Sequence, residues 1–109
     1  MTSSQQPETS VRPAPKRADE LPIAYPVPFV LDRSAPPRYR LRNASLETLT
    51  GVRFSLLGAG NMPVQAPITL DPGETAEVRI HGDDLARSTV LVVRWHRSNG
   101  DEYLWRASF

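Results

Sequence analysis

The residues Arg94 to Arg106, "RWHRSNGDEYLWR", hold most of the side chains in this sequence that could do chemistry. They include two tryptophans, a tyrosine, a histidine, two acids and three arginines. Such residue types serve in catalysis, in metal binding and at protein interfaces. The dipeptide Asn99–Gly100 lies between two strand-like runs and is typical of a β-hairpin turn. The first question is therefore whether these residues form one site or are divided between two faces.

The sequence contains no recognisable catalytic or metal-binding pattern. A Gly-x-Ser-x-Gly nucleophile motif is absent, and Gly58 to Gly60 is not followed by the Lys and Ser/Thr of a phosphate loop. The absence of cysteine excludes disulfides, thiolate catalysis and Cys-ligated zinc. His81 and His96 are expected on strands of different sheets, and His81 with Asp83 supplies only two metal ligands. We therefore expect no enzymatic activity, no metal and no cofactor.

Arginines form a second candidate group, because Lys16 is the only lysine among 13 basic residues. Arg38, Arg40 and Arg42 alternate along one predicted strand and share its outer face, whereas Arg53 is expected on the other sheet. An arginine face could bind phosphates, but charged faces also block edge-to-edge aggregation. The net charge of +1 gives no global field for nucleic acid. Nucleic-acid binding through these four arginines is the alternative function.

The elements that must position these residues are strands. Apolar and polar residues alternate with a period of two in the stretches "RYRLRN", "GVRFSLL" and "TAEVRI". Pro72–Gly73 is suited to a type II turn, and "GDDLARS" to one helical turn capped by Asp83 or Asp84. A short strand is expected near Val64 to Leu70, and a hairpin closes the chain. About seven short antiparallel strands indicate an all-β, immunoglobulin-like sandwich.

The chain before residue 38 has a different composition. Residues 1–20 are polar and rich in Pro, Ser, Thr and Gln, so we expect a disordered tail. Residues 21–37 are apolar, but their prolines exclude a helix or a central strand and predict an extended edge segment. The sandwich is assigned to residues 38–109. No apolar run suits a signal peptide or a membrane span, so the expected location is the cytoplasm.

The stretch from Tyr39 to Trp95 resembles bacterial immunoglobulin-like modules of the cell-adhesion-related kind. Those modules share an Asn after the first core strand, a second strand of pattern "tl-x-x-V-x-f-x-L" and a turn of pattern "L-x-P-G-E-t". The matching positions here are Asn43, Leu49, Val52, Phe54, Leu56, Leu70, Pro72, Gly73 and Glu74. The resemblance implies an immunoglobulin-like sandwich with a non-catalytic accessory or adhesion role.

The hairpin register decides which residues of the opening stretch are exposed. A two-residue turn at Asn99–Gly100 would pair Trp95 with Leu104 and Arg94 with Trp105. Trp95 continues the apolar row of Leu91 and Val93, so its face is expected to line the core. The outward residues are then Arg94, His96, Tyr103 and Trp105. Arg94 would lie over the Trp105 ring, and Arg97 would pair with Glu102 near the tip.

Outward aromatic and arginine side chains are typical anchors of protein interfaces. The sequence therefore predicts a non-enzymatic interaction or structural module that binds a protein partner, or a second copy of itself. The predicted binding residues are Arg94, His96, Tyr103 and Trp105. This prediction depends on the face assignment, because the opposite assignment would bury Trp105 instead.

Overall fold

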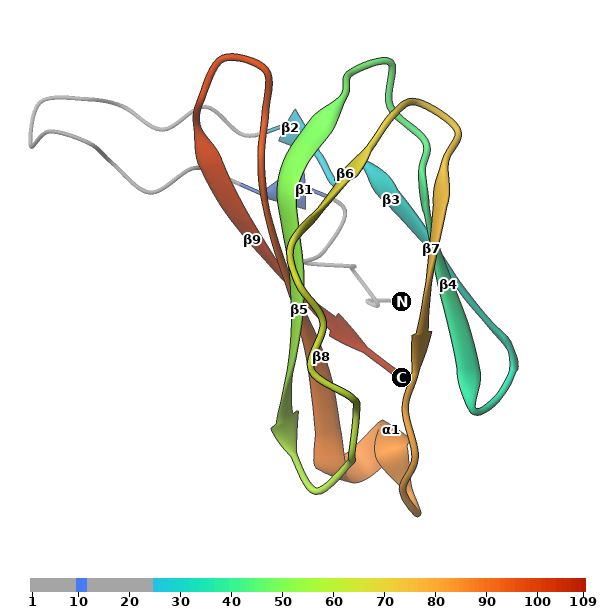
Figure 1. The fold of residues 1–109 in the computed structure, drawn as a ribbon. Coiled ribbons are helices and arrows are strands. Elements are labelled where there is room, and N and C mark those ends of the chain that lie inside the picture. The colour runs from blue at the N-terminus through green and yellow to red at the C-terminus, as the bar shows by residue number, and fades with distance from the viewer. Residues whose placement is uncertain (1–9, 12–24) are drawn as a thin grey trace, which may run out of the picture.

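The structure is a computed structural model that describes residues 10–11 and 25–109. In chain order the elements are β1 (Ser10–Val11), β2 (Tyr25–Pro26), β3 (Phe29–Ala35), β4 (Arg38–Asn43), β5 (Leu49–Gly58), β6 (Ile68–Leu70), β7 (Thr75–Arg79), α1 (Leu85–Ser88), β8 (Thr89–His96) and β9 (Glu102–Ser108). Figure 1 shows two sheets that face each other, with α1 at one end of the sandwich.

Every described ladder is antiparallel. One sheet has the strand order β3-β4-β7 and the other has the order β6-β5-β8-β9, while β1 and β2 form a separate two-stranded ribbon. The prediction of an all-β chain with two packed antiparallel sheets is confirmed. In the part of the chain that is described, no helix is long and apolar enough to cross a membrane.

The core lies between the two sheets and follows the predicted alternation. In β4, Tyr39 and Leu41 are buried, whereas the three arginines between and beside them are exposed. Phe29 meets Trp95 edge-on, with ring centroids 5.0 Å apart, and so joins the two sheets. Phe109 is half-buried and meets Tyr39 edge-on at 5.2 Å. Phe109 therefore packs against the core.

Asn43 is fully buried and fixes the loop that follows β4. Its side-chain amide donates hydrogen bonds to the carbonyl of Glu47 at 2.8 Å and to the carbonyl of Leu70 at 3.0 Å. Its side-chain oxygen accepts from the backbone N–H of Ser45 at 3.0 Å. A buried amide is stable only when its polar atoms are paired in this way. The Asn43 bonds hold residues 44–48 at one end of the sandwich.

The predicted turn and helix form close to their expected positions. The N–H of Glu74 donates to the carbonyl of Asp71 at 3.0 Å, and Gly73 has a φ of +83°. A glycine with positive φ at this position is what a type II turn requires. Asp84, one of the two predicted candidates, is the N-cap residue of α1, although its side chain makes no capping hydrogen bond.

Most of the predicted tail, residues 1–20, lies outside the described residues. The described part of it is β1, which pairs with β2. Within residues 21–37, β3 forms an edge of the three-stranded sheet, and its first residue, Phe29, is buried. The N-terminal part of the chain therefore contributes a strand and an aromatic core residue to the sandwich.

The hairpin between β8 and β9 has a three-residue loop instead of the predicted two-residue loop. The N–H of Arg97 donates to the carbonyl of Asp101, and the N–H of Gly100 donates to the carbonyl of Arg97, both at 2.9 Å. Gly100 has a φ of +89°, which fits a turn followed by a left-handed glycine. Trp95 consequently pairs with Tyr103. The predicted pairing of Trp95 with Leu104 is wrong by one residue.

Candidate functional site

The one-residue change of register reverses the two faces of β9. Trp95 is 0% exposed, which confirms its predicted place in the core. Tyr103 and Trp105 are 3% and 8% exposed, so the prediction that they point outward is wrong. Leu104, which was expected inside, is 40% exposed. Of the four predicted binding residues, the structure therefore keeps only Arg94 and His96 on the outer face.

A cluster of five residues, Tyr25, Glu47, Trp95, Arg97 and Tyr103, occupies the end of the sandwich near the hairpin loop; we call it the Tyr25 cluster. The indole N–H of Trp95 donates to the Tyr25 hydroxyl at 2.6 Å. The Tyr25 ring meets the Tyr103 ring edge-on at 4.4 Å. Burial raises the pKa of the Tyr25 hydroxyl. The cluster fastens β2 to the end of the hairpin.

The predicted cation–π contact of Arg94 with Trp105 is wrong, and the structure has one between Arg97 and Tyr25 instead. The guanidinium carbon of Arg97 lies 4.2 Å from the centroid of the Tyr25 ring. Its Nε donates to Glu47 at 3.2 Å, and its terminal nitrogen donates to the other oxygen of the same carboxylate. This bidentate pairing lowers the pKa of Glu47 and raises the pKa of Arg97, so the pair stays ionised.

The predicted ion pair between Arg97 and Glu102 is wrong. Arg97 binds Glu47, and Glu102 binds Arg53 on β5 at 3.1 Å. The Tyr25 cluster was not visible in the sequence, because Tyr25 and Trp95 are 70 residues apart. Since its polar groups bind one another, we interpret this cluster as structural.

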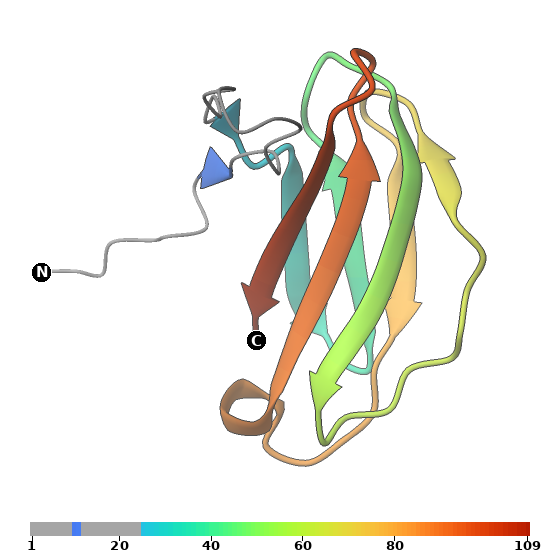
Figure 2. The ribbon, with the colours of Figure 1, turned by 90° about the vertical axis from the view of Figure 1, so that its left-hand side faces the viewer.

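The outer face of the four-stranded sheet is the surface left for binding, and Figure 2 looks directly onto it. The ladders place Arg53, Arg94 and Leu104 in one row across β5, β8 and β9. The next row holds Ser55, Val92 and Arg106. We call Arg53, Leu57, Val92, Arg94, His96, Leu104 and Arg106 the outer face. It combines apolar and cationic side chains.

The arginines of the outer face differ in their partners. Arg53 is paired with Glu102, but neither Arg94 nor Arg106 forms an ion pair with a described residue. Leu57 and Leu104 are 48% and 40% exposed. Val92 points outward but is only 5% exposed, which we attribute to the long side chains beside it. The arrangement leaves two cations around a partly exposed apolar strip.

His96 is positioned by a bulge in β5. The ladder between β5 and β8 shifts between Thr50 and Arg53, and Gly51 in the bulge has a φ of +58°. A Cβ atom at Gly51 would lie 3.0 Å from Nδ1 of His96, so the imidazole ring rests on the glycine. Bulges often re-aim a side chain in this way. His96 is half-buried as a result.

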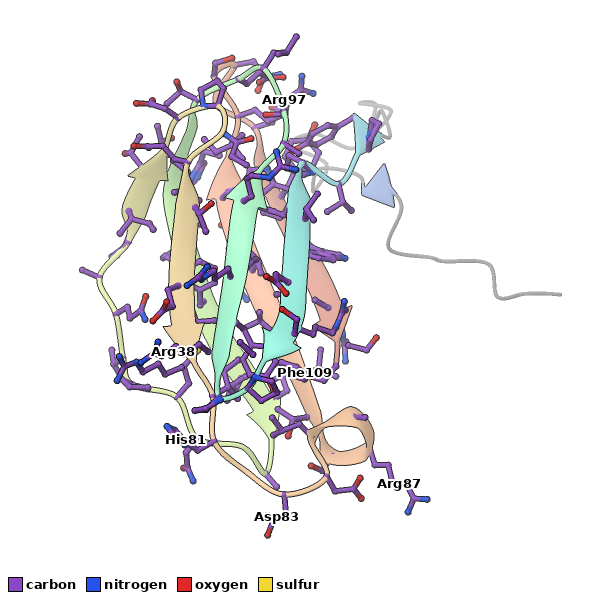
Figure 3. The ribbon with its side chains drawn as sticks, turned by 90° about the vertical axis from the view of Figure 1, so that its right-hand side faces the viewer. Arg38, His81, Asp83, Arg87, Arg97 and Phe109 are labelled. Atoms are coloured by element: carbon purple, nitrogen blue, oxygen red, sulfur yellow. The ribbon has the colours of Figure 1, made fainter. Side chains whose placement is uncertain are left out.

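The four arginines of the alternative site do not form one patch. Arg38, Arg40 and Arg42 share the outer face of the three-stranded sheet, whereas Arg53 lies on the opposite sheet, as predicted. Figure 3 shows Arg38 on the three-stranded side. Asp32 and Glu77 flank Arg40 in the ladder, and Glu77 lies 3.6 Å from its Nε. Acidic residues therefore interrupt this basic row.

The two histidines are far from forming one metal site. Figure 3 places His81 and Asp83 at the opposite end of the sandwich from Arg97, the residue that follows His96. His81 and Asn61 exchange two backbone hydrogen bonds, at 2.7 and 2.8 Å. Within residues 10–11 and 25–109, no group of three or more His, Asp or Glu side chains could hold a metal ion.

The fold and the site thus define a small antiparallel β-sandwich with one mixed apolar and cationic sheet face. Comparisons of the chain with models of protein families, with curated proteins and with solved structures find no match. The functional assignment consequently depends on the geometry and chemistry of the outer face.

Proposed function

We propose that this protein is a non-enzymatic interaction module that binds an acidic protein surface through its outer face. The observation that supports this most strongly is the pair Arg94 and Arg106, which are exposed and have no ion-pair partner among the described residues. Arg94 lies opposite the partly exposed Leu104 in the ladder, and Arg106 lies two residues further along β9. A partner with carboxylates around an apolar side chain would complement this pattern.

Each part of the outer face would have its own role in binding. Arginine can hold a carboxylate with two parallel hydrogen bonds, which fixes the orientation of the partner. Leu57 and Leu104 would lose their remaining exposed area to the partner, which supplies the hydrophobic contribution. His96 packs against Gly51 in the bulge, so its imidazole ring would already be in a fixed position when the partner binds.

We also propose that the sandwich is immunoglobulin-like, as the sequence resemblance implies. Counting from β3, the first, second and fifth strands form one sheet, and the third, sixth and seventh belong to the other. Immunoglobulin domains divide these six strands in the same way, which supports the proposal, whereas the fourth strand, β6, pairs with β5 and so lies in the second sheet. An accessory or adhesion role is consistent with this fold. The bacterial origin and the cytoplasmic location stay predictions.

The proposed function can be tested with two matched charge reversals. Arg94→Glu changes the outer face, and Arg42→Glu changes an exposed arginine at a similar mid-strand position on the other sheet. Each variant would be immobilised beside the wild-type protein and exposed to a lysate of the source organism. We expect proteins that bind the wild type and Arg42→Glu to be lost by Arg94→Glu. Circular dichroism in the tryptophan bands checks that both variants fold.

A captured protein would then be purified and titrated directly. Reversing Arg94 should weaken its binding at least about tenfold, because a carboxylate would then face a like charge. Equal binding by wild type and Arg94→Glu would contradict the proposed site. If Arg42→Glu instead lost binding to a labelled single-stranded oligonucleotide, with a steep dependence on salt, the alternative nucleic-acid function would be favoured.

A further inference from the structure

The outer edge of β9 presents backbone groups that face away from β8. The carbonyl of Asp101 accepts a hydrogen bond from the N–H of Arg97, across the hairpin. Hydrogen-bonded and non-hydrogen-bonded pairs alternate along an antiparallel ladder, so the odd-numbered residues of β9 point their backbone groups towards β8. The even-numbered residues therefore point theirs to the free edge: Glu102, Leu104, Arg106 and Ser108. The Ser108 carbonyl is occupied, since it accepts from Nε of Arg33 at 3.0 Å.

The other three edge residues have no strand partner among the described residues. The ladder of β9 is with β8 alone, and β1, which lies close to β9, has its ladder with β2. Figure 2 shows β9 as the outermost strand of its sheet. Unpaired N–H and C=O groups in a row can accept a further strand.

β9 lacks the features that block pairing at two of the other edges, β3 and β6. The remaining edge strand, β7, also pairs without a register shift but has only five residues. The edge strand β3 has a register shift between Asp32 and Ala35 and is followed by Pro36 and Pro37. The edge strand β6 has three residues, with Pro67 directly before it. In contrast, β9 has seven residues, contains no proline and pairs with β8 without a register shift. Such an edge is suited to strand addition.

The outward side chains of β9 are complementary to themselves in an antiparallel arrangement. When two copies of this strand are related by a two-fold axis at Leu104, each Glu102 lies opposite Arg106 of the second copy, and the two Leu104 side chains meet. Opposite charges that face each other across strands are stabilising, and like charges are destabilising. This register gives two such opposite-charge pairs around an apolar centre.

We infer that two copies of this protein associate through β9, antiparallel and centred on Leu104. The residue pairs 102–106, 104–104 and 106–102 would each exchange backbone hydrogen bonds, which would satisfy the edge groups that have no strand partner within residues 10–11 and 25–109. Glu102 already binds Arg53, but its side chain is 48% exposed and so has room for a second arginine. The two four-stranded sheets become one continuous sheet. This association uses the strand edge and goes beyond the proposed function. It shares Leu104 and Arg106 with the outer face, whereas the proposed function is tested at Arg94, which lies on β8 away from the edge.

Single cysteines test the position of the axis, because the chain has no cysteine of its own. Opposite Cα atoms in a hydrogen-bonded pair lie about 5.5 Å apart, which is within the range of a disulfide. Leu104→Cys should form a covalent dimer under mild oxidation. Leu57→Cys is the matched control, since Leu57 is similarly exposed but lies on β5, away from the edge.

The expected result is a reversible wild-type dimer in sedimentation equilibrium and rapid cross-linking of Leu104→Cys alone. A wild-type protein that stays monomeric at every concentration would overturn the inference. Equal cross-linking of the two cysteine variants would overturn it as well, because random collision would then explain the disulfide.

A charge exchange tests the register. Glu102→Arg and Arg106→Glu should each weaken the dimer about tenfold or more, because each creates two like-charge pairs. The double variant E102R/R106E should restore the wild-type dissociation constant. The two residues are about 13 Å apart along one extended strand, so rescue requires contact between two copies. A double variant that dimerises as weakly as the single variants would refute the proposed register.

Discussion

Trp95 and Trp105 face the same core, but they differ in their hydrogen bonds. The indole N–H of Trp95 donates to Tyr25, whereas the buried indole N–H of Trp105 has no partner among the described residues. A buried donor without a partner loses its hydration without compensation, which costs about 1–3 kcal/mol. The two tryptophans are therefore expected to contribute unequally to stability.

Trp95→Phe should destabilise the protein more than Trp105→Phe, by about 1 kcal/mol or more. Both substitutions remove the same atoms, so the loss of volume is matched. Only Trp95→Phe breaks a hydrogen bond, and it leaves the Tyr25 hydroxyl unpaired. Urea denaturation of the two variants checks the difference. An equal or larger loss for Trp105→Phe would show that its indole N–H is paired in solution.

The ion pair between Glu47 and Arg97 should make stability depend on acidity. The hydrogen bond from Arg97 lowers the pKa of Glu47 from its ordinary value of 4.5. A carboxylate with a lowered folded-state pKa stabilises the fold above its unfolded pKa, and this contribution disappears as the pH falls through the folded-state value. Stability should therefore decrease below about pH 4.5.

Glu47→Gln should reduce this acid dependence, because a neutral amide does not titrate. The measurement is the free energy of unfolding from urea titrations between neutral pH and pH 3. Arg97→Gln should show the same reduced slope, since Glu47 would then lose the bond that lowers its pKa. If both variants kept the wild-type slope, other carboxylates would be responsible for the acid sensitivity.

At the scale of elements, the alternation of residues in β4 and β7 was sufficient to predict which side chains are buried. Tyr39, Leu41, Ala76 and Val78 all lie in the core. These strands have one clearly polar and one clearly apolar row, so each row has only one stable orientation. The presence of the terminal hairpin was likewise predictable from Asn99–Gly100.

The register of that hairpin was not predicted correctly, for a local physical reason. Asn99–Gly100 fits a two-residue turn as well as the last two positions of a three-residue loop. The bonds of Arg97 to Asp101 and Gly100 select the longer loop, which shifts β9 by one residue. The correct register could have been predicted from β9 itself. Its even-numbered positions include three polar residues, which favour solvent: Glu102, Arg106 and Ser108.

The importance of glycine in the bulge at Gly51 can be measured as a loss of stability after substitution. Gly51→Ala should destabilise the protein by about 1 kcal/mol or more, because φ is positive and the new Cβ would press on His96. Gly73→Ala is the matched control, since Gly73 also has a positive φ but has open space around it. Thermal unfolding should show a larger loss for Gly51→Ala. Equal losses of melting temperature would mean that the His96 ring moves away from the new Cβ atom without a loss of stability.

At the scale of the whole molecule, Tyr25 links the N-terminal part of the chain to the end of the sandwich. Removing residues 1–20 takes away β1, which has two residues and pairs only with β2 among the described strands. We expect the melting temperature to stay nearly unchanged. Extending the deletion through Pro26 should lower it clearly, because Trp95 and Arg97 both lose their contacts with Tyr25. A large loss from the shorter deletion would show that residues 1–20 stabilise the sandwich.

The sandwich divides the charged residues of the chain between its two faces. Glu77 forms ion pairs with Arg40 and Arg79 on the three-stranded sheet, whereas Arg94 and Arg106 on the outer face have no ion-pair partner among the described residues. The outer face and the free edge of β9 are both consequences of one register. A shift of one residue would place Tyr103 and Trp105 outside and would remove both surfaces.

The register of β8 and β9 is therefore the claim on which the account depends, and nuclear Overhauser effects measure it directly. In an antiparallel ladder, the Hα atoms of non-hydrogen-bonded pairs lie close together. The structure predicts strong Hα–Hα effects between Arg94 and Leu104 and between His96 and Glu102. A strong effect between Trp95 and Leu104 would contradict the account, because β9 would then be shifted by one residue and Trp105 would lie on the outer face.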